Sequence, residues 1–465
     1  MKRSMQNLPS MLRDRMMSGK RITAVSALAV SAVLAGLPTA WGATQYWSGN
    51  TNTNWGTGTN WQAGSVPANT DIIRIQNPAE NFPVITTGDT ITTGDIYTHG
   101  DTTVTIEGGT LNLNGRWRIG GSNDPKGHAV VNFTGGTINV GNKEGYGFTM
   151  GAQQVMTLNI SGTAKMVNPL IFDLHAGAST TEASTINMSG GSLFLTDSRF
   201  IVGEGGFGVM NLTGGVVSTN YLQMGRNQND DNSDPKYANP SGFLNIGTEA
   251  GTGNGQIYIR ETANIGTART DVTGRGSINL NSGIFSVRNL NLTDGRSTLN
   301  LNGGTFLAQK VTGNITNTGS TVEVSKNFDA SQTSIEGLAE DQTFYSAKQK
   351  GTVGTMTVSG PYAQTGGTLV LDYTGASSFD KLTAANFTIT GGTLRINDSG
   401  TMPTQETIVG FFGDSPTGTI HFDSVKATKN TRAWSVDNNV VSYRVKEDFH
   451  WLGGTSTDWS DKSNW

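Results

Sequence analysis

One short phrase recurs through most of this chain: an alternating apolar strand, a Gly-Gly pair and a second alternating strand. Its clear copies read VTIEGGTLNL at Val104–Leu113, VNFTGGTINV at Val131–Val140, INMSGGSLFL at Ile186–Leu195, MNLTGGVVST at Met210–Thr219 and LNLNGGTFLA at Leu299–Ala308. Successive Gly pairs or their equivalents begin at positions 108, 135, 162, 190 and 214, so the steps are 27, 27, 28 and 24 residues. Self-similarity at such a period indicates a repeat architecture.

Each phrase has the pattern of two half-buried strands around a corner. Apolar residues two apart, such as Val131 and Phe133, place one face of a strand inward. The Gly pair allows a corner that a residue with a Cβ would resist. No phrase can bury its apolar face alone, whereas repeats stacked about 4.8 Å apart share one continuous core. The sequence therefore predicts an all-β chain that forms an elongated, right-handed parallel β-helix (β-solenoid).

A row of asparagines accompanies the phrase. Asn stands between the two apolar residues in seven copies, at Asn132, Asn159, Asn187, Asn211, Asn245, Asn279 and Asn300. If the copies are in register, these side chains stack as an amide ladder, which stabilises in-register parallel strands. The alternative is a row of polar ligands for a glycan. We favour the ladder.

A second phrase, a strand followed by a single Gly, gives each repeat at least two faces. Its copies end at Gly120, Gly151, Gly203, Gly225 and Gly266. Each such Gly marks a further corner of the repeat.

A tryptophan motif stands near both ends of the chain. YWSGNTNTNWGTGTNW places Trp47, Trp55 and Trp61 at steps of eight and six, and FHWLGGTSTDWSDKSNW repeats those steps with Trp451, Trp459 and Trp465. We therefore expect one complete unit followed by the start of a second. A buried Trp cluster would cover the open end of the repeat stack, whereas exposed Trp side chains would form a carbohydrate platform. We favour the cap.

The N-terminus has the pattern of a secretory signal peptide. Basic residues precede an apolar run from Ile22 to Leu37, and small residues at Ala40 and Gly42 predict cleavage after Gly42. The run is too short and too rich in Ala for a membrane anchor. Residues 1–42 hold six of the 32 basic and one of the 36 acidic residues, so their removal takes the formal net charge from −4 to −9. An acidic chain without basic clusters is a poor ligand for nucleic acid or anionic lipid.

These patterns divide the chain into six segments. They are the signal peptide (1–42), the Trp-motif cap with the first repeats (43–100), the β-helix repeats (101–310), an irregular segment (311–350), the C-terminal repeats and cap (351–446), and the truncated start of a second Trp-motif unit (447–465). The irregular segment contains NITNTGSTVEVSKN, which is a further repeat or a hairpin, and the only stretch that could hold a short helix. The chain has no Cys, which leaves stability to the strand ladders.

Two short motifs resemble enzyme signatures, but the residues around them do not fit the structures that those signatures require. GEGGFG at Gly203–Gly208 matches the dinucleotide fingerprint, yet a strand pattern follows it where a helix is required. GDSP at Gly413–Pro416 shares three letters with a serine-hydrolase signature, and its partner would have to be His421 or His450.

A polar excursion from Arg226 to Gly242 resembles a calcium loop in part. Asp230, Asn232 and Asp234 have the alternate-residue spacing of such loops, but Pro235 stands where the turn requires Gly and no Glu occupies the twelfth position. Calcium binding in this loop stays open beside the simpler alternative of a solvated loop.

One polar group could serve an enzyme. Parallel β-helices also carry polysaccharide lyases and hydrolases, which need carboxylates that converge with a basic residue. Asp173, His175 and Arg199 lie about one repeat apart and could meet on one face, as could almost any three polar residues in such a fold. We therefore assign no catalytic, cofactor-binding or metal-binding residue from the sequence.

The leading motif WSGNTNTNWGTGTNWQAGSVP, the iterated LNLNGGT phrases and the closing TVSGPYAQTGGTLVLDY and FDKLTAANFTITGGTLRI segments together span nearly all of residues 44–446. In this order they resemble the secreted β-helix proteins of Gram-negative bacteria that carry autotransporter-type passenger regions with autotransporter-associated β-strand repeats. The resemblance implies export across the inner membrane, display on or release from the cell surface, and adhesion or aggregation. The family pattern also includes a C-terminal membrane barrel or a short sorting tail; the sequence up to Trp465 shows neither pattern, so either would have to lie beyond that residue.

We expect a non-catalytic scaffold that is secreted or associated with the outer membrane at the cell surface. It would bind surface glycans or other cells along its length, and we expect no cofactor, no nucleic-acid partner and no membrane span in this segment. One alternative is a polysaccharide-active lyase or hydrolase on the same pectin-lyase-like fold. A carboxylate cluster with raised pKa values in a groove would favour that enzyme. Another alternative is a passive spacer for a downstream module.

Overall fold

The computed structural model describes residues 42–76, 78–120, 127–141, 147–168, 171–175, 181–226, 240–266, 274–324, 326–328, 349–429 and 433–444. Several sequence predictions lie outside these ranges. They are the signal peptide up to residue 41, the excursion with Asp230–Asp234, the stretch expected to hold a short helix up to residue 348, His450 and the second Trp motif.

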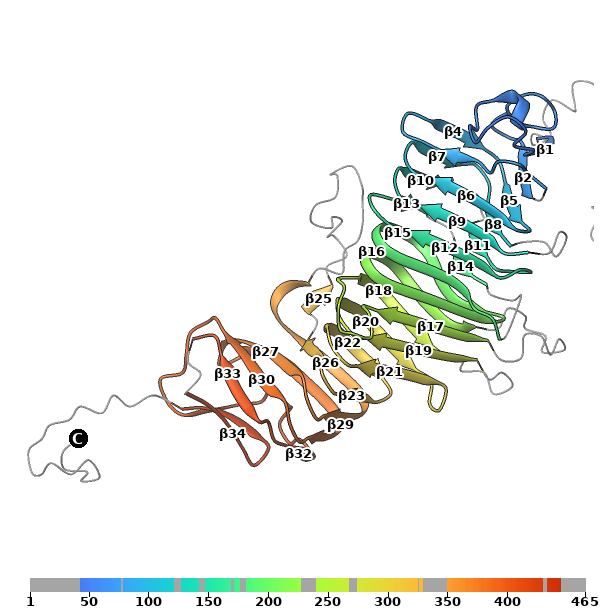
Figure 1. Ribbon diagram of the computed structural model, residues 1–465. Helices are drawn as coiled ribbons and strands as arrows, with labels where there is room; N and C mark the ends of the chain where they lie inside the picture. The colour runs from blue at the N-terminus through green and yellow to red at the C-terminus, as the bar shows by residue number, and fades with distance from the viewer. Residues whose placement is uncertain are drawn as a thin grey trace, which may run out of the picture. The chain divides into compact units, whose positions relative to one another are not determined.

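The described chain is nearly all β-structure, with parallel strands in one large sheet. Within the described ranges, the helical element with defined bounds is a single 3-10 turn, η3 (Gly58–Asn60). Most strands of the large sheet pair in parallel with the equivalent strand of the next repeat, so that successive repeats lie side by side in Figure 1. This arrangement is consistent with the predicted β-solenoid.

The strand before each Gly pair forms the first of three parallel stacks. Its strands are β3 (Val84–Ile85), β6 (Thr102–Ile106), β9 (Ala129–Phe133), β12 (Met156–Ile160), β17 (Ser241–Ile246), β19 (Arg275–Leu280), β21 (Ser297–Leu301), β23 (Ile315–Asn317) and β32 (Gly418–Ile420). Inward and outward residues alternate along each strand, as the burial of β9 and β12 shows.

The strand after each Gly pair forms the second stack. Its strands are β4 (Thr90–Thr93), β7 (Thr110–Leu113), β10 (Thr137–Val140), β13 (Lys165–Val167), β24 (Thr321–Val324), β27 (Thr368–Gly375), β30 (Thr393–Asp398) and β33 (Ser424–Ala427). The corner between the two stacks needs glycine, because Gly109 and Gly136 have φ of 67° and 78°, a region that L-residues avoid.

The strand of the single-Gly phrase forms the third stack. It consists of β1 (Thr44–Tyr46), β2 (Ile72–Gln76), β5 (Ile96–His99), β8 (Trp117–Ile119), β11 (Phe148–Met150) and β14 (Phe172–Leu174). Later repeats join two or three stacks in one continuous strand: β15 (Ser184–Glu204), β16 (Phe207–Arg226), β18 (Gln256–Ile265), β20 (Ile284–Leu292), β22 (Thr305–Thr312), β26 (Gln349–Gln364) and β29 (Lys381–Ile389).

The segment 314–324, which the sequence left open as a repeat or a hairpin, continues the stacks. Strand β23 pairs in parallel with β21 through Leu301 and Asn317, and β24 pairs in parallel with β22 from Thr305 to Ala308. Among the described strands, antiparallel pairing is confined to β25 (Lys326–Phe328) with β26, β28 (Ser378–Phe379) with β27, and a separate sheet of β31 (Thr407–Val409), β35 (Val440–Tyr443) and β34 (Trp434–Asp437).

The core is a column of inward-facing side chains that repeats from strand to strand. In the third stack, Trp117, Phe148, Phe172 and Phe200 are fully buried and follow one another with ring centroids 5.3, 5.5 and 5.5 Å apart. These distances are close to the spacing of neighbouring strands. Each repeat therefore gains its apolar contacts from the repeats on either side.

The three N-terminal tryptophans are buried together. The exposed fractions of Trp47, Trp55 and Trp61 are 1%, 4% and 2%, and Trp61 packs edge-on against both neighbours at centroid distances of 5.0 and 4.9 Å. The cluster adjoins β1, the first strand of the third stack. The alternative of an exposed carbohydrate platform is wrong for these three side chains, because their faces pack against one another.

No helix among the residues that the structure describes has the length and hydrophobicity needed to traverse a bilayer.

Candidate functional site

The predicted amide ladder is present in the first stack. All seven asparagines from Asn132 to Asn300 occupy equivalent positions of neighbouring strands. From Asn159 onward, each amide nitrogen donates to the Oδ1 of the preceding asparagine, at distances of 2.9, 3.1, 2.9, 2.9, 2.7 and 2.6 Å along the row. The ladder therefore connects seven successive repeats by side-chain hydrogen bonds outside the core.

A polar groove of about 620 Å³ lies over part of this ladder. Ladder residues Asn211, Asn245 and Asn279 line it, together with Thr248 and Glu249 from the turn after β17. A primary amide has two N–H donors and a carbonyl with two lone pairs, and the ladder bond uses one donor and one lone pair. The remaining groups can form hydrogen bonds with a ligand in the groove.

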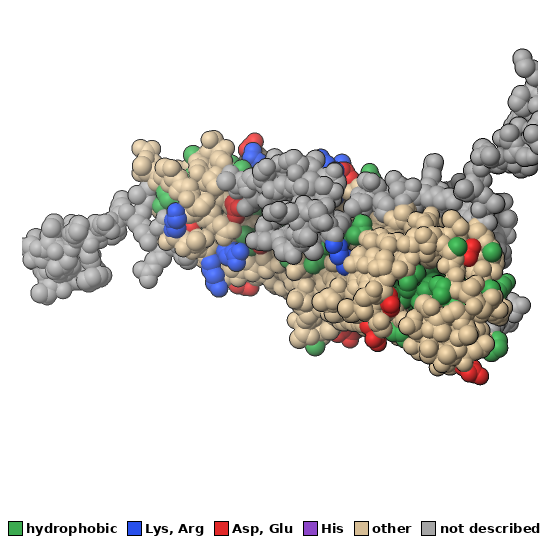
Figure 2. Space-filling model, turned by 90° about the horizontal axis from the view of Figure 1, so that it is seen from above, with side chains coloured by type: hydrophobic (Ala, Val, Ile, Leu, Met, Phe, Trp, Pro, Cys, Tyr) green, Lys and Arg blue, Asp and Glu red, His purple; other side chains and the backbone are tan. Residues whose placement is uncertain are grey.

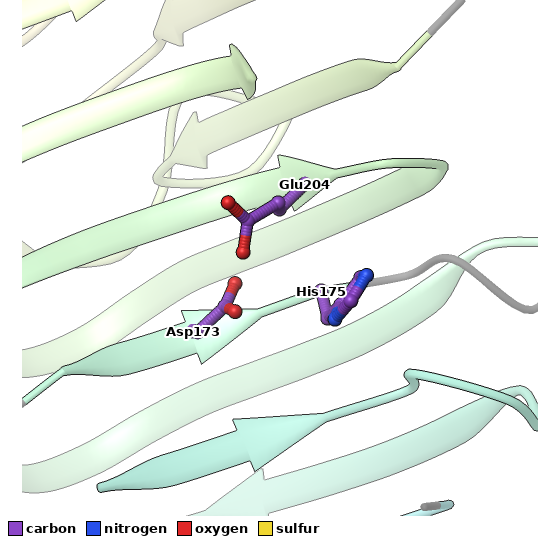
Figure 3. A group of neighbouring side chains, drawn as sticks. All are labelled: Asp173, His175 and Glu204. Carbon is purple, nitrogen blue, oxygen red and sulfur yellow. The ribbon is translucent and has the colours of Figure 1, made fainter. Parts of the chain in front are cut away.

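A separate cluster of ionisable side chains lies at the end of the third stack. Asp173 is in β14, His175 follows that strand, and Glu204 ends β15 in the next repeat. Figure 3 shows the two carboxyl groups facing each other, with the His175 ring beside them. One potential ligand atom from each residue lies within 4.8 Å of the others. The exposed fraction of each of the three residues is 5%.

His175 replaces the corner glycine of its repeat. Pairing of Leu174 with Val202 aligns His175 with Gly203. In five repeats this position is a glycine with φ between 65° and 78°: Gly120, Gly151, Gly203, Gly225 and Gly266. His175 does not have a positive φ. Its backbone N–H nevertheless donates to the backbone oxygen of Met150, as in the regular pairing of the third stack. This repeat therefore carries a buried imidazole where the repeats on either side have Gly151 and Gly203.

Electrostatics in the cluster favour a protonated carboxyl group. Burial raises the pKa of Asp173 well above its ordinary value, and the charge of Glu204 and a hydrogen bond between the two side chains raise it further. The charges of Arg226 and Arg199 act in the opposite direction. The Asp173 carboxyl group therefore holds its proton to a higher pH than an exposed aspartic acid would.

Glu204 has a cationic partner in the following repeat. Arg226 ends β16, directly opposite Glu204 in the register, and its Nη1 lies 2.8 Å from Glu204 Oε1. The Arg226 side chain is 34% exposed and also lines a groove of about 590 Å³ with Gln223 and Asn264. Arg226 thus connects the buried cluster to a solvent-accessible surface.

The structure brings together part of the polar group that the sequence analysis considered for an enzyme. Asp173 and His175 do meet, and Arg199, which begins the last part of β15, is close enough to lower the pKa of Asp173. The sequence prediction missed Glu204 and Arg226. Each comes directly after a corner glycine of the single-Gly phrase, which is the signal that could have identified them.

The GEGGFG and GDSP motifs do not form a site of this kind in the structure. GEGGFG at Gly203–Gly208 runs from the end of β15 through a turn into β16, which confirms that no helix follows it. Ser415 and His421 are both exposed, so the GDSP motif lies on the surface and outside any described pocket.

No protein-family model, curated protein or solved structure matches this chain.

Proposed function

We propose that the chain is a secreted or cell-surface scaffold that binds glycans or other cells through its polar groove and acts in adhesion or aggregation, as an autotransporter-like passenger does. The single observation that carries this proposal is the groove over the amide ladder. It presents identical side chains at the spacing of the repeats, which suits a ligand that is itself a polar polymer.

The finer fold assignment belongs to the same proposal: the chain is a right-handed parallel β-helix. Three stacks of parallel strands follow one another in constant order along the chain, and each strand pairs with its equivalent in the next repeat. The right-handed sense is the one that parallel crossover connections adopt in nearly all proteins.

The surface composition is compatible with such a scaffold. On the face shown in Figure 2, the charged side chains are scattered among uncharged polar side chains and backbone. Ligands would then be bound by hydrogen bonds and shape more than by charge. The signal-peptide pattern and the motif order described above support export to the cell surface.

The test uses the full chain on a panel of immobilised glycans and in a cell-aggregation assay. Replacing Asn245 and Glu249 by Ala changes the groove. We expect about 5- to 150-fold weaker binding, since two hydrogen bonds of about 0.5–1.5 kcal/mol each are lost. Asn139→Ala is the matched control, because Asn139 donates to Asn112 at 2.9 Å in a short ladder of the second stack, away from the groove. Equal loss in both variants, or no binding and no aggregation by the unmodified chain, would reject the proposal.

The second candidate is a polysaccharide-active enzyme, and the observation that favours it is the Asp173–Glu204 carboxyl pair beside His175. A carboxyl group with a raised pKa next to an imidazole is typical of acid–base sites. The pair is in hydrogen-bonding contact, however, whereas the carboxyl groups of glycoside hydrolases are about 5–9.5 Å apart. Release of reducing or unsaturated sugar ends that Asp173→Asn abolishes would establish this function in place of the scaffold.

A further inference from the structure

The Asp173 carboxyl group has an unmet hydrogen-bonding requirement. Its Oδ1 is buried and has no hydrogen-bond partner among the described residues. A buried acceptor without a partner costs about 1–3 kcal/mol, so such atoms call for an explanation. The oxygen belongs to a group that also contains an imidazole and a second carboxyl group.

We propose that Asp173, His175 and Glu204 form a binding site for one Zn²⁺ ion, with Arg226 orienting Glu204 from outside the site. The proposal goes beyond the scaffold function and does not depend on it, because it concerns a different stack and different residues.

The geometry is close to that required. Three ligands about 2.1 Å from a tetrahedral ion lie about 3.4 Å from one another, and the ligand atoms here lie within 4.8 Å of one another. Each side chain would have to move inward by less than about 1 Å. The three ligands come from two neighbouring repeats, so an ion would join β14 to the end of β15.

The donor set selects the class of metal. One imidazole nitrogen and two carboxylate oxygens suit Zn²⁺ and its first-row neighbours, whereas Ca²⁺ and Mg²⁺ prefer six or more oxygen ligands. Three protein ligands leave a fourth position for water, which is the arrangement of zinc sites with an open position. The Arg226–Glu204 ion pair of 2.8 Å resembles the hydrogen bonds that commonly hold ligating carboxylates in place.

The test is titration of the purified, metal-free full chain with Co²⁺ as a spectroscopic probe and with Zn²⁺ in calorimetry. We expect one ion per chain, a visible Co²⁺ absorption band typical of a tetrahedral site, displacement of Co²⁺ by Zn²⁺, and a higher unfolding midpoint with the ion bound. None of these readouts requires a catalytic activity.

Two variants assign the site. His175→Gly restores the glycine found at this corner in the neighbouring repeats, so the variant is expected to fold, and Glu204→Gln keeps the size of the side chain. Each variant should weaken Co²⁺ binding by at least about 100-fold. Changes to residues that only contact the ligands already weaken metal binding by about 10- to 100-fold, and here a ligand itself is removed. His128→Ala is the control, because His128 is exposed and bonded to Thr157 at 2.9 Å. Binding that is absent in the unmodified chain, or that survives in His175→Gly and Glu204→Gln, would overturn the proposal.

Discussion

The side-chain amide of Asn245 donates a hydrogen bond to the Oδ1 of Asn211, 2.9 Å away in the preceding repeat. Asn245 in turn accepts a bond of 2.7 Å from Asn279. Each interior member of the ladder thus takes part in two side-chain hydrogen bonds, whereas Asn300 at the end of the row donates one, to Asn279 at 2.6 Å.

This difference gives the first prediction. Asn245→Ala removes two ladder bonds and should lower the free energy of unfolding by about 1–3 kcal/mol, and Asn300→Ala should cost about half as much, because a net hydrogen bond contributes about 0.5–1.5 kcal/mol. Chemical denaturation followed by circular dichroism measures both. Equal costs would show that the ladder does not act through its side-chain bonds.

A second prediction concerns the buried tryptophans. Trp61→Ala should cost about 3–5 kcal/mol, because it removes a large buried ring that packs against Trp47 and Trp55 and donates from Nε1 to the Trp55 oxygen at 2.9 Å. Trp61→Phe should cost less, since it keeps an aromatic ring. Hydrogen exchange should show the loss of protection first in β1 and β2. Unchanged protection in Trp61→Ala would contradict the proposed cap.

A third prediction compares two glycines that have the same φ. It distinguishes the cost of a left-handed backbone conformation from the cost of steric overlap with a neighbouring strand. Gly225 and Gly295 both have φ of 65°. A Cβ at Gly295 meets nothing within 4 Å, whereas a Cβ at Gly225 would overlap the backbone oxygen of Arg275 at the start of β19. Gly295→Ala should therefore cost about 1–2 kcal/mol from the left-handed conformation alone.

Gly225→Ala should cost more, by at least about 2 kcal/mol beyond Gly295→Ala, because the neighbouring strand must also shift. Unfolding midpoints of the two variants compare them directly. Similar midpoints would mean that neighbouring repeats can move apart at this corner without a large loss of packing.

The fourth prediction concerns alkaline pH. Tyr362 is fully buried, its hydroxyl group donates to Gln364 Oε1 at 2.8 Å, and burial raises its pKa above the ordinary value of 10.0. Above pH 10 the unfolded chain loses this proton while the folded chain keeps it. The contribution of Tyr362 to stability is therefore present below pH 10 and falls by about 1.4 kcal/mol per pH unit above it.

Tyr362→Phe removes this dependence. The variant should be less stable than the unmodified chain at pH 8, because the bond to Gln364 is lost, and the difference should shrink and reverse as the pH rises above about 10. Denaturation at a series of pH values measures the two curves. Parallel curves would mean that Tyr362 ionises equally in the folded and unfolded chains.

Much of the architecture could be predicted because every repeat carries the same pattern of apolar residues and glycines. An alternation of apolar residues allows only one face to be buried, and a shift of one residue would expose it. The register of Asn132 with Asn159 follows directly from that requirement. The Gly pairs then mark the corners, since only glycine adopts the required angles at positions such as Gly109 and Gly136.

The candidate metal site could be predicted only in part. Outward-facing polar residues are not fixed by the apolar pattern, so many sets of three were equally compatible with the sequence. Asp173 and His175 were among them, but Glu204 was not, because its position three residues beyond the partner of Asp173 depends on the path of the chain through the corner at Gly203.

The sequence alone therefore determined the period, the buried face and the amide ladder, because each repeats the same short-range requirement many times. Only the tertiary structure decided that Asp173, His175 and Glu204 share one buried space, and that Trp61 packs edge-on against both Trp47 and Trp55 in the buried cluster that the sequence favours. The three ionisable residues occur once, so no periodic signal marks their convergence. It depends on how side chains at one corner of the stack fill the space that the backbone leaves.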